Sequence, residues 1–548
     1  MQVPPCRTGC EAGYLTRQGR DLGGVKLAIR ARFAVLAGLL AAGSVLVAPG
    51  ATAQSAVPAV QWGACPEESL KDVPPAERPL FNCATYAVPL DHDKPRKETI
   101  SLALMRRAAS NQQQRIGSLF LNPGGPGGSG WGLPLAGKAI FQPEVLERFD
   151  LVGFDPRGVA RSTPLRCFKT NEEANAVFAK AALVPVTKQQ INDTVDAYAE
   201  YSDYCARNAG DLLEHMATKD VAQDLDLLRQ AVGDKKLTYV GFSYGTLLGA
   251  TYVNMFPRNS RAIILDGNVD PRLRLTNGLQ YDRERAIGFE IALEAYLKRC
   301  DAEGDKCAFS EGNPRAKFDE IRNHLRKEPI TLPNGDVLTL DSFTGGVGGN
   351  LYSPAVLKAL AVALQEVYNV LHPSGSAQLA TADLSVLTKP SKVGKYDAPA
   401  DTPYTSDDSY QAVNCSDKPF PRHPQLIPLL ADVWERESPT FGRYQIFSDP
   451  LACATWPAKH PDPYRGPWGR KTENPVLVIG NYYDPATQYE FAKRMSRQLG
   501  NSVLLSVDAF GHCILGDSLG VDKAAANYLI TLQAPKPGQV YQPNAQPF

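Results

Sequence analysis

A strand, a glycine-flanked turn and a helix follow one another between residues 237 and 256. Residues 238–240 read Thr-Tyr-Val, residues 241–245 read Gly-Phe-Ser-Tyr-Gly, and an apolar helical run extends from residue 247 to residue 256. In this context the central serine stands on a strained strand-to-helix turn at the edge of a sheet, and the two glycines allow neighbouring backbone to approach closely. The pattern therefore predicts an α/β architecture that presents Ser243 as a nucleophile.

A nucleophilic serine needs a general base, and one histidine is placed for that role. His512 comes five residues after the strand pattern of residues 502–507, late in the chain. A histidine beyond the last strands of an α/β sheet is where this architecture puts its base. The other six histidines lie in polar, loop-like or helical contexts: His92, His215, His324, His372, His423 and His460. We therefore expect His512 to act as the base.

The acid that orients the histidine should lie between the serine and the histidine in chain order. Asp484 follows the buried-type strand of residues 475–480, which contains four consecutive aliphatic residues. Asp266 follows the strand of residues 262–265 and is an alternative, because some hydrolases of this type take the acid one strand earlier. Asp508 is too close to His512 along the chain to reach its ring easily. We expect Asp484 to be the acid and keep Asp266 as its rival.

A glycine-rich loop follows the short apolar strand of residues 118–121. Residues 122–130 read Asn-Pro-Gly-Gly-Pro-Gly-Gly-Ser-Gly, so few side chains obstruct the backbone amides. We expect the amides of Gly125 and Tyr244 to form an oxyanion hole, because acyl transfer needs two donors at the attacked oxygen. No Gly-Lys-Ser/Thr follows, which excludes a P-loop, and no acidic residue completes a dinucleotide fingerprint.

Taken together, these motifs resemble the secreted tripeptidyl aminopeptidases of actinobacterial type, in the prolyl-aminopeptidase-like branch of the α/β-hydrolases. The resemblance covers nearly the whole mature chain and rests on residues 122–130, 150–158, 241–245, Asp484 and the Gly-His-Cys of 511–513. Gln488 departs from it, since the family pattern has proline there. The resemblance implies an α/β-hydrolase fold and a serine exopeptidase that binds peptides with a free N-terminus and uses no cofactor and no metal. A carboxylesterase with the same triad is the alternative, because the family also contains esterases.

About two hundred residues separate the strand ending at Leu265 from the strand starting at Val476. A plain connection between two strands needs far fewer, so the sequence predicts a large, mostly helical cap between the late core strands. The predicted domains are a leader (1–53), a first hydrolase part (54–270), the cap (271–470) and a C-terminal hydrolase part (471–548). Helices are expected at 218–232 with Thr218 as N-cap, and in the cap at 288–299, 316–327 and 355–371. The polar segment 374–408 is expected to be a mobile loop.

The N-terminus has the features of a secretory signal peptide. Basic residues precede an apolar run at 33–48, and Ala-Thr-Ala at 51–53 predicts cleavage near Ala53. A run of sixteen residues is short for a membrane span of about 20, so no stable membrane anchor is expected. Lys and Arg balance Asp and Glu at 58 each without a basic stripe, which excludes nucleic acid as an expected partner.

The cysteines agree with export to an oxidising compartment. Nine of the eleven lie after the predicted cleavage site. One connectivity among many joins neighbours in sequence: Cys65 with Cys83, Cys167 with Cys205, Cys300 with Cys307, and Cys415 with Cys453. Cys513 lies beside the expected base and is left free. No spacing typical of a zinc site is present.

The cap should determine the substrate. An aminopeptidase must hold the α-ammonium of its substrate, and a buried carboxylate does this best. Asp417 is our candidate anchor, with Asp407 and Asp408 as poorer ones, although a purely structural role is as plausible for each. Asp155 and Arg157 are expected to brace the oxyanion loop.

Overall fold

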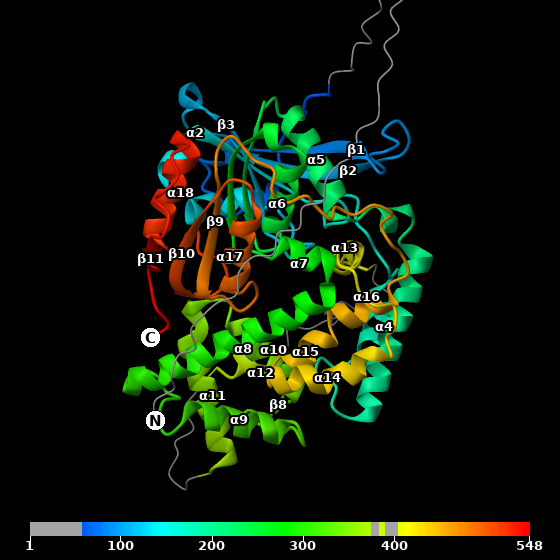
Figure 1. Ribbon diagram of the computed structural model, residues 1–548, viewed down its shortest axis with the longest axis vertical. Helices are drawn as coiled ribbons and strands as arrows, with labels where there is room; N and C mark the ends of the chain where they lie inside the picture. The colour runs from blue at the N-terminus through cyan, green and yellow to red at the C-terminus, as the bar shows by residue number, and fades with distance from the viewer. Residues whose placement is uncertain (1–56, 374–382, 389–403) are drawn as a thin grey trace, which may run out of the picture. The chain divides into compact units, whose positions relative to one another are not determined.

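The computed structural model describes residues 57–373, 383–388 and 404–548 (Figure 1). The predicted signal peptide with its cleavage site near Ala53, and most of the predicted loop 374–408, lie outside the described residues. The domain limits at 53, 270 and 470 stay predictions.

A nine-stranded sheet forms the centre of the described chain (Figure 1). Its strands, in spatial order, are β1 (Phe81–Pro89), β2 (Thr99–Arg107), β4 (Phe149–Phe154), β3 (Gly117–Asn122), β5 (Leu237–Phe242), β6 (Ser260–Asp266), β9 (Val476–Tyr483), β10 (Ser502–Phe510) and β11 (Val540–Tyr541). The pairs β1–β2 and β2–β4 are antiparallel, and all other neighbouring pairs are parallel. The predicted α/β-hydrolase fold is confirmed.

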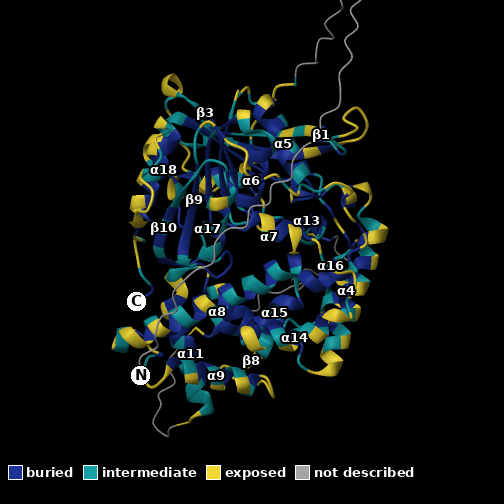
Figure 2. Ribbon diagram, in the orientation of Figure 1, coloured by how far each residue is buried: buried dark blue, intermediate teal, exposed yellow. Residues whose placement is uncertain are grey.

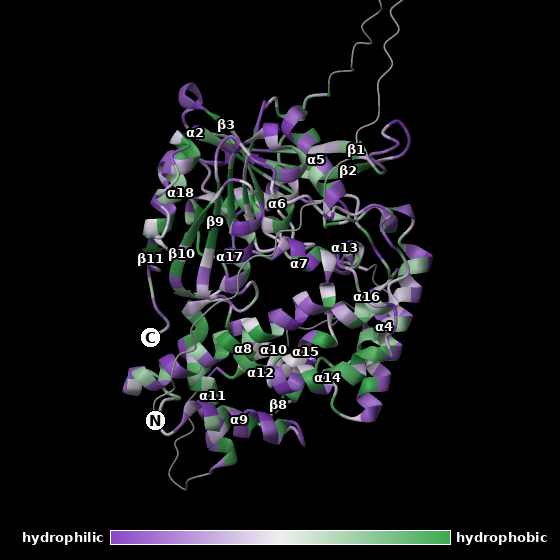
Figure 3. Cartoon of the chain, viewed as in Figure 1, coloured by the Kyte–Doolittle hydropathy of each residue, from purple (hydrophilic) through white to green (hydrophobic). Residues whose placement is uncertain are grey.

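The inner strands are apolar and buried because helices cover both faces of the sheet (Figures 2 and 3). Side chains alternate between faces, so Phe120 packs with α5 (Thr218–Ala231) and α6 (Gly245–Met255). Its neighbours in β3, Leu119 and Leu121, pack instead with α2 (Pro143–Arg148) and α18 (Leu519–Thr531). Burial on both faces explains why these strands read as continuous apolar runs in the sequence.

The helical insertion lies between β6 and β9. Its helices are α7 (Pro271–Thr276), α8 (Gly278–Glu303), α9 (Pro314–Leu325), α10 (Leu340–Asn350), α11 (Leu357–Leu371), α12 (Ser385–Thr388), α13 (Ser409–Asp417), α14 (Leu426–Glu437), α15 (Gly442–Ile446) and α16 (Asp449–Thr455). A short ribbon of β7 (Ile330–Thr331) and β8 (Val337–Leu338) joins them. The insertion has an apolar core of its own, to which α8, α9, α10 and α11 all contribute. We call this segment the cap.

One stretch of the cap, Pro354–Leu371, is long and apolar enough to cross a membrane by length and composition. Its leucines at 357, 360 and 364 are fully buried in the core of the cap. This burial accounts for the apolar composition of the stretch, since a helix in the core of a folded domain can be as long and as apolar as a membrane-spanning helix.

Two more helices, α3 (Asn171–Phe178) and α4 (Lys188–Asn208), precede α5 in the chain. Helix α4 lies beside α16 of the cap, where the Ser202 hydroxyl donates a hydrogen bond of 2.9 Å to Thr455. The cap therefore packs against this earlier insertion as well as against the sheet.

The prediction that Thr218 caps α5 is wrong. The helix begins at Thr218 itself, and Ala217 occupies the N-cap position. The Asp220 carboxylate accepts from the Ala217 amide at 3.2 Å, while the Thr218 hydroxyl donates to Asp417 of α13. The Thr218 hydroxyl, which the local sequence pattern assigns to capping, is instead hydrogen-bonded to a residue of a helix that is distant in the sequence.

Four disulfide bonds close the predicted pairs, Cys65–Cys83, Cys167–Cys205, Cys300–Cys307 and Cys415–Cys453. Within the described ranges, Cys513 is the cysteine that remains free, as predicted.

Candidate active site

Ser243 occupies a sharp turn between β5 and α6. Its φ of +56° lies in the left-handed region, which costs a non-glycine residue about 1–3 kcal/mol and is typical of functional turns. Its amide donates to the Asp266 carbonyl at 2.9 Å, and its carbonyl accepts from the Thr246 hydroxyl at 2.6 Å. The turn is therefore held from both sides, and Ser243 stays half-buried at the end of the sheet.

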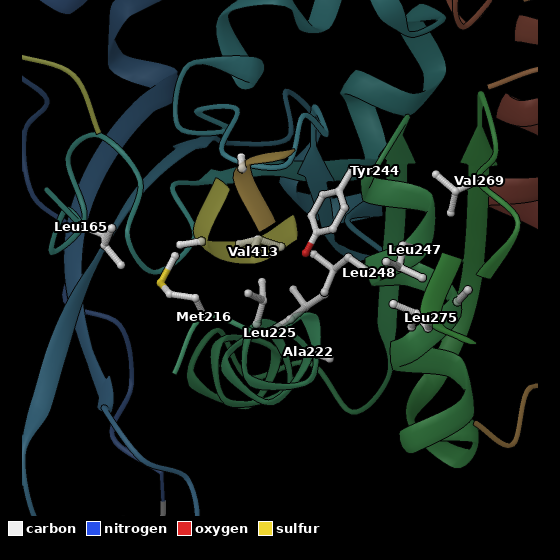
Figure 4. Close-up of a cluster of buried hydrophobic side chains, with 14 of the residues drawn as sticks. Leu165, Met216, Ala222, Leu225, Tyr244, Leu247, Leu248, Val269, Leu275 and Val413 are labelled. Atoms are coloured by element: carbon white, nitrogen blue, oxygen red, sulfur yellow. The ribbon is translucent and has the colours of Figure 1, made fainter. Parts of the chain in front are cut away.

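The side chain of the next residue, Tyr244, anchors this turn in the core. Figure 4 shows its ring within a cluster of buried apolar side chains that includes Leu225 of α5, Leu248 of α6 and Val413 of α13. Because the Thr218 hydroxyl donates its hydrogen to Asp417, the Tyr244 hydroxyl donates to Thr218. The residue that carries one expected oxyanion donor is thereby tied to the cap.

The structure brings His512 and Asp484 together. Nδ1 of His512 lies 2.9 and 2.8 Å from the two carboxylate oxygens of Asp484. The carboxylate is 2% exposed and is fixed by the amides of Ala486 and Thr487 and by the Thr487 hydroxyl. With Nδ1–H donating to Asp484, Nε2 is the acceptor nitrogen of the neutral ring.

The environment of His512 has two opposing effects on its pKa. Burial lowers the pKa, because it disfavours the charged ring, but the charge and hydrogen bond of Asp484 raise it. The net result is a pKa above the ordinary value of 6.5.

The rival acid, Asp266, makes different contacts. One carboxylate oxygen accepts hydrogen bonds of 2.9 Å from the amides of Ile514 and Leu515, which follow the histidine. Burial raises the pKa of this fully buried carboxyl to about 6. Asp508, the other rival, lines a separate groove of about 980 Å³ along α8. The ring of His512 is thus hydrogen-bonded to Asp484 and not to either rival.

The glycine-rich loop lies directly against the nucleophile. A Cβ on Gly124 would fall 2.4 Å from the Phe242 carbonyl oxygen and 2.8 Å from Ser243 Cβ, and φ is +94°. Only glycine fits here. Gly125 and Tyr244, the two expected oxyanion donors, line the same cavity as Ser243 and His512.

Asp155 braces this loop as predicted: its carboxylate accepts from the Ser129 hydroxyl at 2.6 Å and from the Trp131 amide at 3.0 Å. The expectation for Arg157 is wrong. Its buried guanidinium pairs with Asp224 of α5 and donates to the carbonyls of Pro89 and Leu90, so it fastens the end of β1 to α5.

The cavity at Ser243 has a volume of about 300 Å³, and a neighbouring cavity of about 260 Å³ shares three of its lining residues. The shared residues are Arg285, Tyr352 and Tyr410. The first cavity also receives Arg274, Tyr281 and Asn414 from the cap, and the second receives Gln445 and Ser448. None of the described residues that line either cavity carries a carboxylate.

The three predicted anchor acids all have structural partners. Asp417 is 1% exposed, does not line either cavity, and accepts hydrogen bonds from the amide and the hydroxyl of Thr218. Asp408 accepts from the Cys167 amide and the Tyr201 hydroxyl, and burial raises its pKa to about 6. Asp407 accepts from the amides of residues 160 and 409.

Two residues that support the base were not predicted. The Tyr352 carbonyl accepts from the His512 amide at 2.9 Å, and its ring meets the imidazole edge-on at 5.2 Å between centroids. The Asn481 amide group donates to the carbonyls of Gly511 and Cys513 at 3.0 and 2.9 Å. A buried polar residue at the end of a strand was the available signal for Asn481; no local pattern marks Tyr352.

Comparisons with known proteins agree with this architecture. Residues 117–288 match the family model described as "alpha/beta hydrolase fold", and residues 438–541 match the model described as "TAP-like protein". The chain is 33% identical to the serine protease Hip1 of Mycobacterium tuberculosis over 83% of this chain and 86% of that protein.

Two further relatives have comparable coverage. Carboxylesterase B of Mycobacterium tuberculosis is 33% identical over 90% of this chain and 94% of its own length. The tripeptidyl aminopeptidase of Streptomyces lividans is 29% identical over 85% of this chain and 83% of its own length. With this fold, this arrangement of Ser243, His512 and Asp484, and these relatives, the chain belongs to the α/β-hydrolase family, in the group that includes Hip1 and carboxylesterase B.

Proposed function

We propose that this protein is a secreted serine exopeptidase that releases short peptides, with tripeptides as the expected product, from substrates with a free N-terminus. The observation that carries the proposal is the convergence of Ser243, His512, Gly125 and Tyr244 on one cavity roofed by the cap. Relatives named as a serine protease and as a tripeptidyl aminopeptidase support a peptidase over an esterase. Four disulfide bonds support export, because such bonds persist in oxidising compartments.

In the proposed reaction, Nε2 of His512 takes the proton of the Ser243 hydroxyl while Oγ attacks the carbonyl carbon. The amides of Gly125 and Tyr244 stabilise the oxyanion, and Asp484 stabilises the imidazolium that forms. His512 then gives its proton to the leaving amine, and the acyl group stays bonded to Ser243. Water, activated by His512, attacks the acyl-enzyme and releases the short peptide with its new carboxylate.

An exopeptidase also has to hold the α-ammonium of its substrate. Asp417 could do so only by giving up its bonds to Thr218. Asp449 is placed better: its Oδ2 binds the Lys418 ammonium at 2.6 Å and lies 3.5 Å from the hydroxyl of Tyr410, which lines both cavities, but its Oδ1 has no hydrogen-bond partner and is left for a ligand. We therefore place the ammonium beside Tyr410, which lines both cavities, with Asp449, which contacts Tyr410 from outside the cavity lining, as the preferred anchor and Asp417 as the alternative.

The test compares free and N-acetylated tripeptide p-nitroanilides. Acetylation removes the positive charge and leaves one oxygen of a buried carboxylate without its partner, a cost of about 2–5 kcal/mol, or roughly thirty- to several-thousand-fold in kcat/KM. Asp449→Asn should produce a comparable loss on free peptides and little loss on small p-nitrophenyl esters. Equal cleavage of free and acetylated peptides would contradict the exopeptidase and favour the esterase alternative, which the relative named carboxylesterase B also represents.

A further inference from the structure

The cavity beside Ser243 contains a cation without an ion-pair partner. The guanidinium of Arg274 is 3% exposed and lines this cavity. In the part of the chain that the structure describes, no carboxylate oxygen lies within 4.0 Å of it. Its Nε has no hydrogen-bond partner, and one of its terminal nitrogens donates to Oδ1 of Asn414 at 2.5 Å.

The carboxylates whose charges act on Arg274 make their direct contacts with other groups. Asp282 and Asp449 both bind the Lys418 ammonium, at 3.0 and 2.6 Å. Asp417 accepts from Thr218. Burial lowers the pKa of Arg274, but Tyr281 and the carboxylates of Asp282, Asp417 and Asp449 raise it by more, so the charge is stabilised without a direct ion pair. The rings of Tyr244 and Tyr281 lie 5.8 and 5.2 Å from the guanidinium carbon. The hydrogen-bonding capacity of the guanidinium is still not fully used, since its Nε has no partner.

Asn414 adds a second donor at the same place. It is fully buried, lines the cavity, and its Nδ2 has no hydrogen-bond partner. Since Oδ1 of Asn414 accepts from Arg274, the amide is oriented and its nitrogen is left for another acceptor. A planar guanidinium beside an amide donor matches the two oxygens of a carboxylate.

We propose that Arg274 and Asn414 form a subsite that binds a carboxylate on the acyl part of the substrate. For a peptide this is the side chain of an acidic residue among those released, because the proposed reaction bonds the acyl part to Ser243, and Arg274 and Asn414 line the same cavity as Ser243. The inference rests on the proposed function for its peptide substrates, but its chemistry applies equally to an ester whose acyl chain ends in a carboxylate.

The experiment uses two pairs of substrates and three variants. Tripeptide p-nitroanilides carry Glu or Gln at each position in turn, and p-nitrophenyl monoadipate is compared with p-nitrophenyl hexanoate. Arg274→Met removes the cation. Asn414→Asp is nearly isosteric and places a carboxylate beside Arg274. The new carboxylate should form an ion pair with the guanidinium in place of the substrate's carboxylate, without a change of fold. Arg272→Met is the matched control, because Arg272 lies on the same helix with an exposed side chain.

We expect the wild-type enzyme to prefer Glu over Gln at one position, and the monoadipate over the hexanoate, by roughly ten- to a hundredfold in kcat/KM. Both Arg274→Met and Asn414→Asp should abolish this preference, because each should lower kcat/KM for the acidic member of a pair far more than for the neutral member, and Arg272→Met should leave the preference intact. Absence of any acid preference in the wild type, or its persistence in Asn414→Asp, would overturn the proposal.

Failure of the proposed function would look different. Suppose that no peptide is cleaved, but that the enzyme prefers the monoadipate to the hexanoate and loses this preference in Asn414→Asp. The proposed exopeptidase activity is then wrong, and the proposed carboxylate subsite is supported. If neutral free peptides are cleaved and no acid preference exists with either substrate pair, the subsite is wrong and the exopeptidase stands.

Discussion

The carbonyl of Asp266 accepts a hydrogen bond of 2.9 Å from the amide of Ser243. The carboxylate of the same residue accepts from the amides of Ile514 and Leu515, two and three residues beyond His512. One residue at the end of β6 thus holds the nucleophile turn with its main chain and the base loop with its side chain. The residue that rivals Asp484 in the sequence therefore fixes the positions of two loops that must act together.

Asp266→Asn should keep these contacts, since the amide oxygen still accepts, and should leave kcat/KM within about tenfold of the wild type. The pKa of about 6 in the folded protein lies above the ordinary aspartate pKa of 3.8, so the carboxyl contributes stability below pH 3.8 that is lost as pH rises through 6. Asn does not titrate. Relative to wild type, the variant should gain up to about 3 kcal/mol of unfolding free energy between pH 4 and pH 7.

Denaturant unfolding at the two pH values measures this difference. Asp266→Leu is the control: it removes the acceptor, leaves two buried amides unpaired at about 1–3 kcal/mol each, and should destabilise the protein at both pH values. An Asp266→Asn protein that is less stable at pH 7 than at pH 4, relative to wild type, would contradict the assignment of a raised pKa.

Ser243→Ala, His512→Ala and Asp484→Asn should each reduce kcat by about three to four orders of magnitude without lowering Tm by more than a few degrees. Members of a triad act as a unit, so the double variants should be little worse than the worst single one. Steady-state kinetics with a p-nitrophenyl ester measure this. If Asp484→Asn stays near wild type while Asp266→Asn is inactive, the acid has been assigned to the wrong strand.

The rate of ester hydrolysis should fall on the acidic side with a midpoint above 6.5, because the neutral ring of His512 is the base and Asp484 raises its pKa. In Asp484→Asn the main cause of the raised pKa is removed, while burial and the smaller effect of the Asp266 charge remain, so the midpoint of the residual activity should move to lower pH. A profile of kcat/KM against pH measures both. An identical midpoint in the two proteins would mean that a group other than His512 controls this limb.

The same shift affects stability in the opposite pH direction from activity. Protonated His512 is stabilised in the folded state, so its contribution to the unfolding free energy is fully present below pH 6.5 and is lost as pH rises through the folded pKa.

Gly124→Ala should reduce kcat/KM by about a hundredfold or more on esters and peptides alike, because the new methyl group would collide with the Phe242 carbonyl and with Ser243. Gly233→Ala is the matched control. It has a similar φ of +85°, but its Cβ would meet nothing within 4 Å, so it should cost about 1 kcal/mol of stability and leave the kinetics unchanged. Equal kinetic effects in both variants would mean that backbone strain, and not proximity to Ser243, is responsible.

The disulfide bonds should contribute unequally to stability. In the chain-entropy model, the Cys300–Cys307 bond closes 7 residues and is worth about 2 kcal/mol, whereas Cys167–Cys205 closes 38 and is worth about 4 kcal/mol. Denaturant unfolding of two variants, one with both Cys300 and Cys307 replaced by alanine and one with both Cys167 and Cys205 replaced by alanine, shows which bond contributes more to the free energy of unfolding. Mass mapping under non-reducing conditions should recover four bridges and a free Cys513. Nine reduced cysteines in active secreted enzyme would contradict the inference that leads from the cysteine pattern to export.

The arrangement of the candidate site was predictable because each of its parts carries a local signal. A strand that ends in a glycine-flanked serine, an aspartate after an aliphatic run and a histidine after the last long strand can each be found without knowing what lies nearby. Arg274, Tyr352 and Asn414 carry no such signal, since their meaning depends on which side chains the cap brings beside Ser243. Thr218 shows that a local signal can also mislead. Its sequence context is typical of a helix N-cap, but its amide and hydroxyl donate to Asp417, 199 residues away, and the residue lies inside the helix.

The strands that precede and follow the cap are direct neighbours in the sheet, and Asp266 is paired in register with Ile479. Because β9 begins at Val476, three residues before Ile479, the two ends of the insertion are held about 11 Å apart, whatever the length of chain between them. The free energy of closing such a loop grows only slowly with its length. An evolving gene can lengthen, shorten or replace this segment while the sheet and its catalytic loops stay in place, and new specificities can arise without rebuilding the enzyme that carries them.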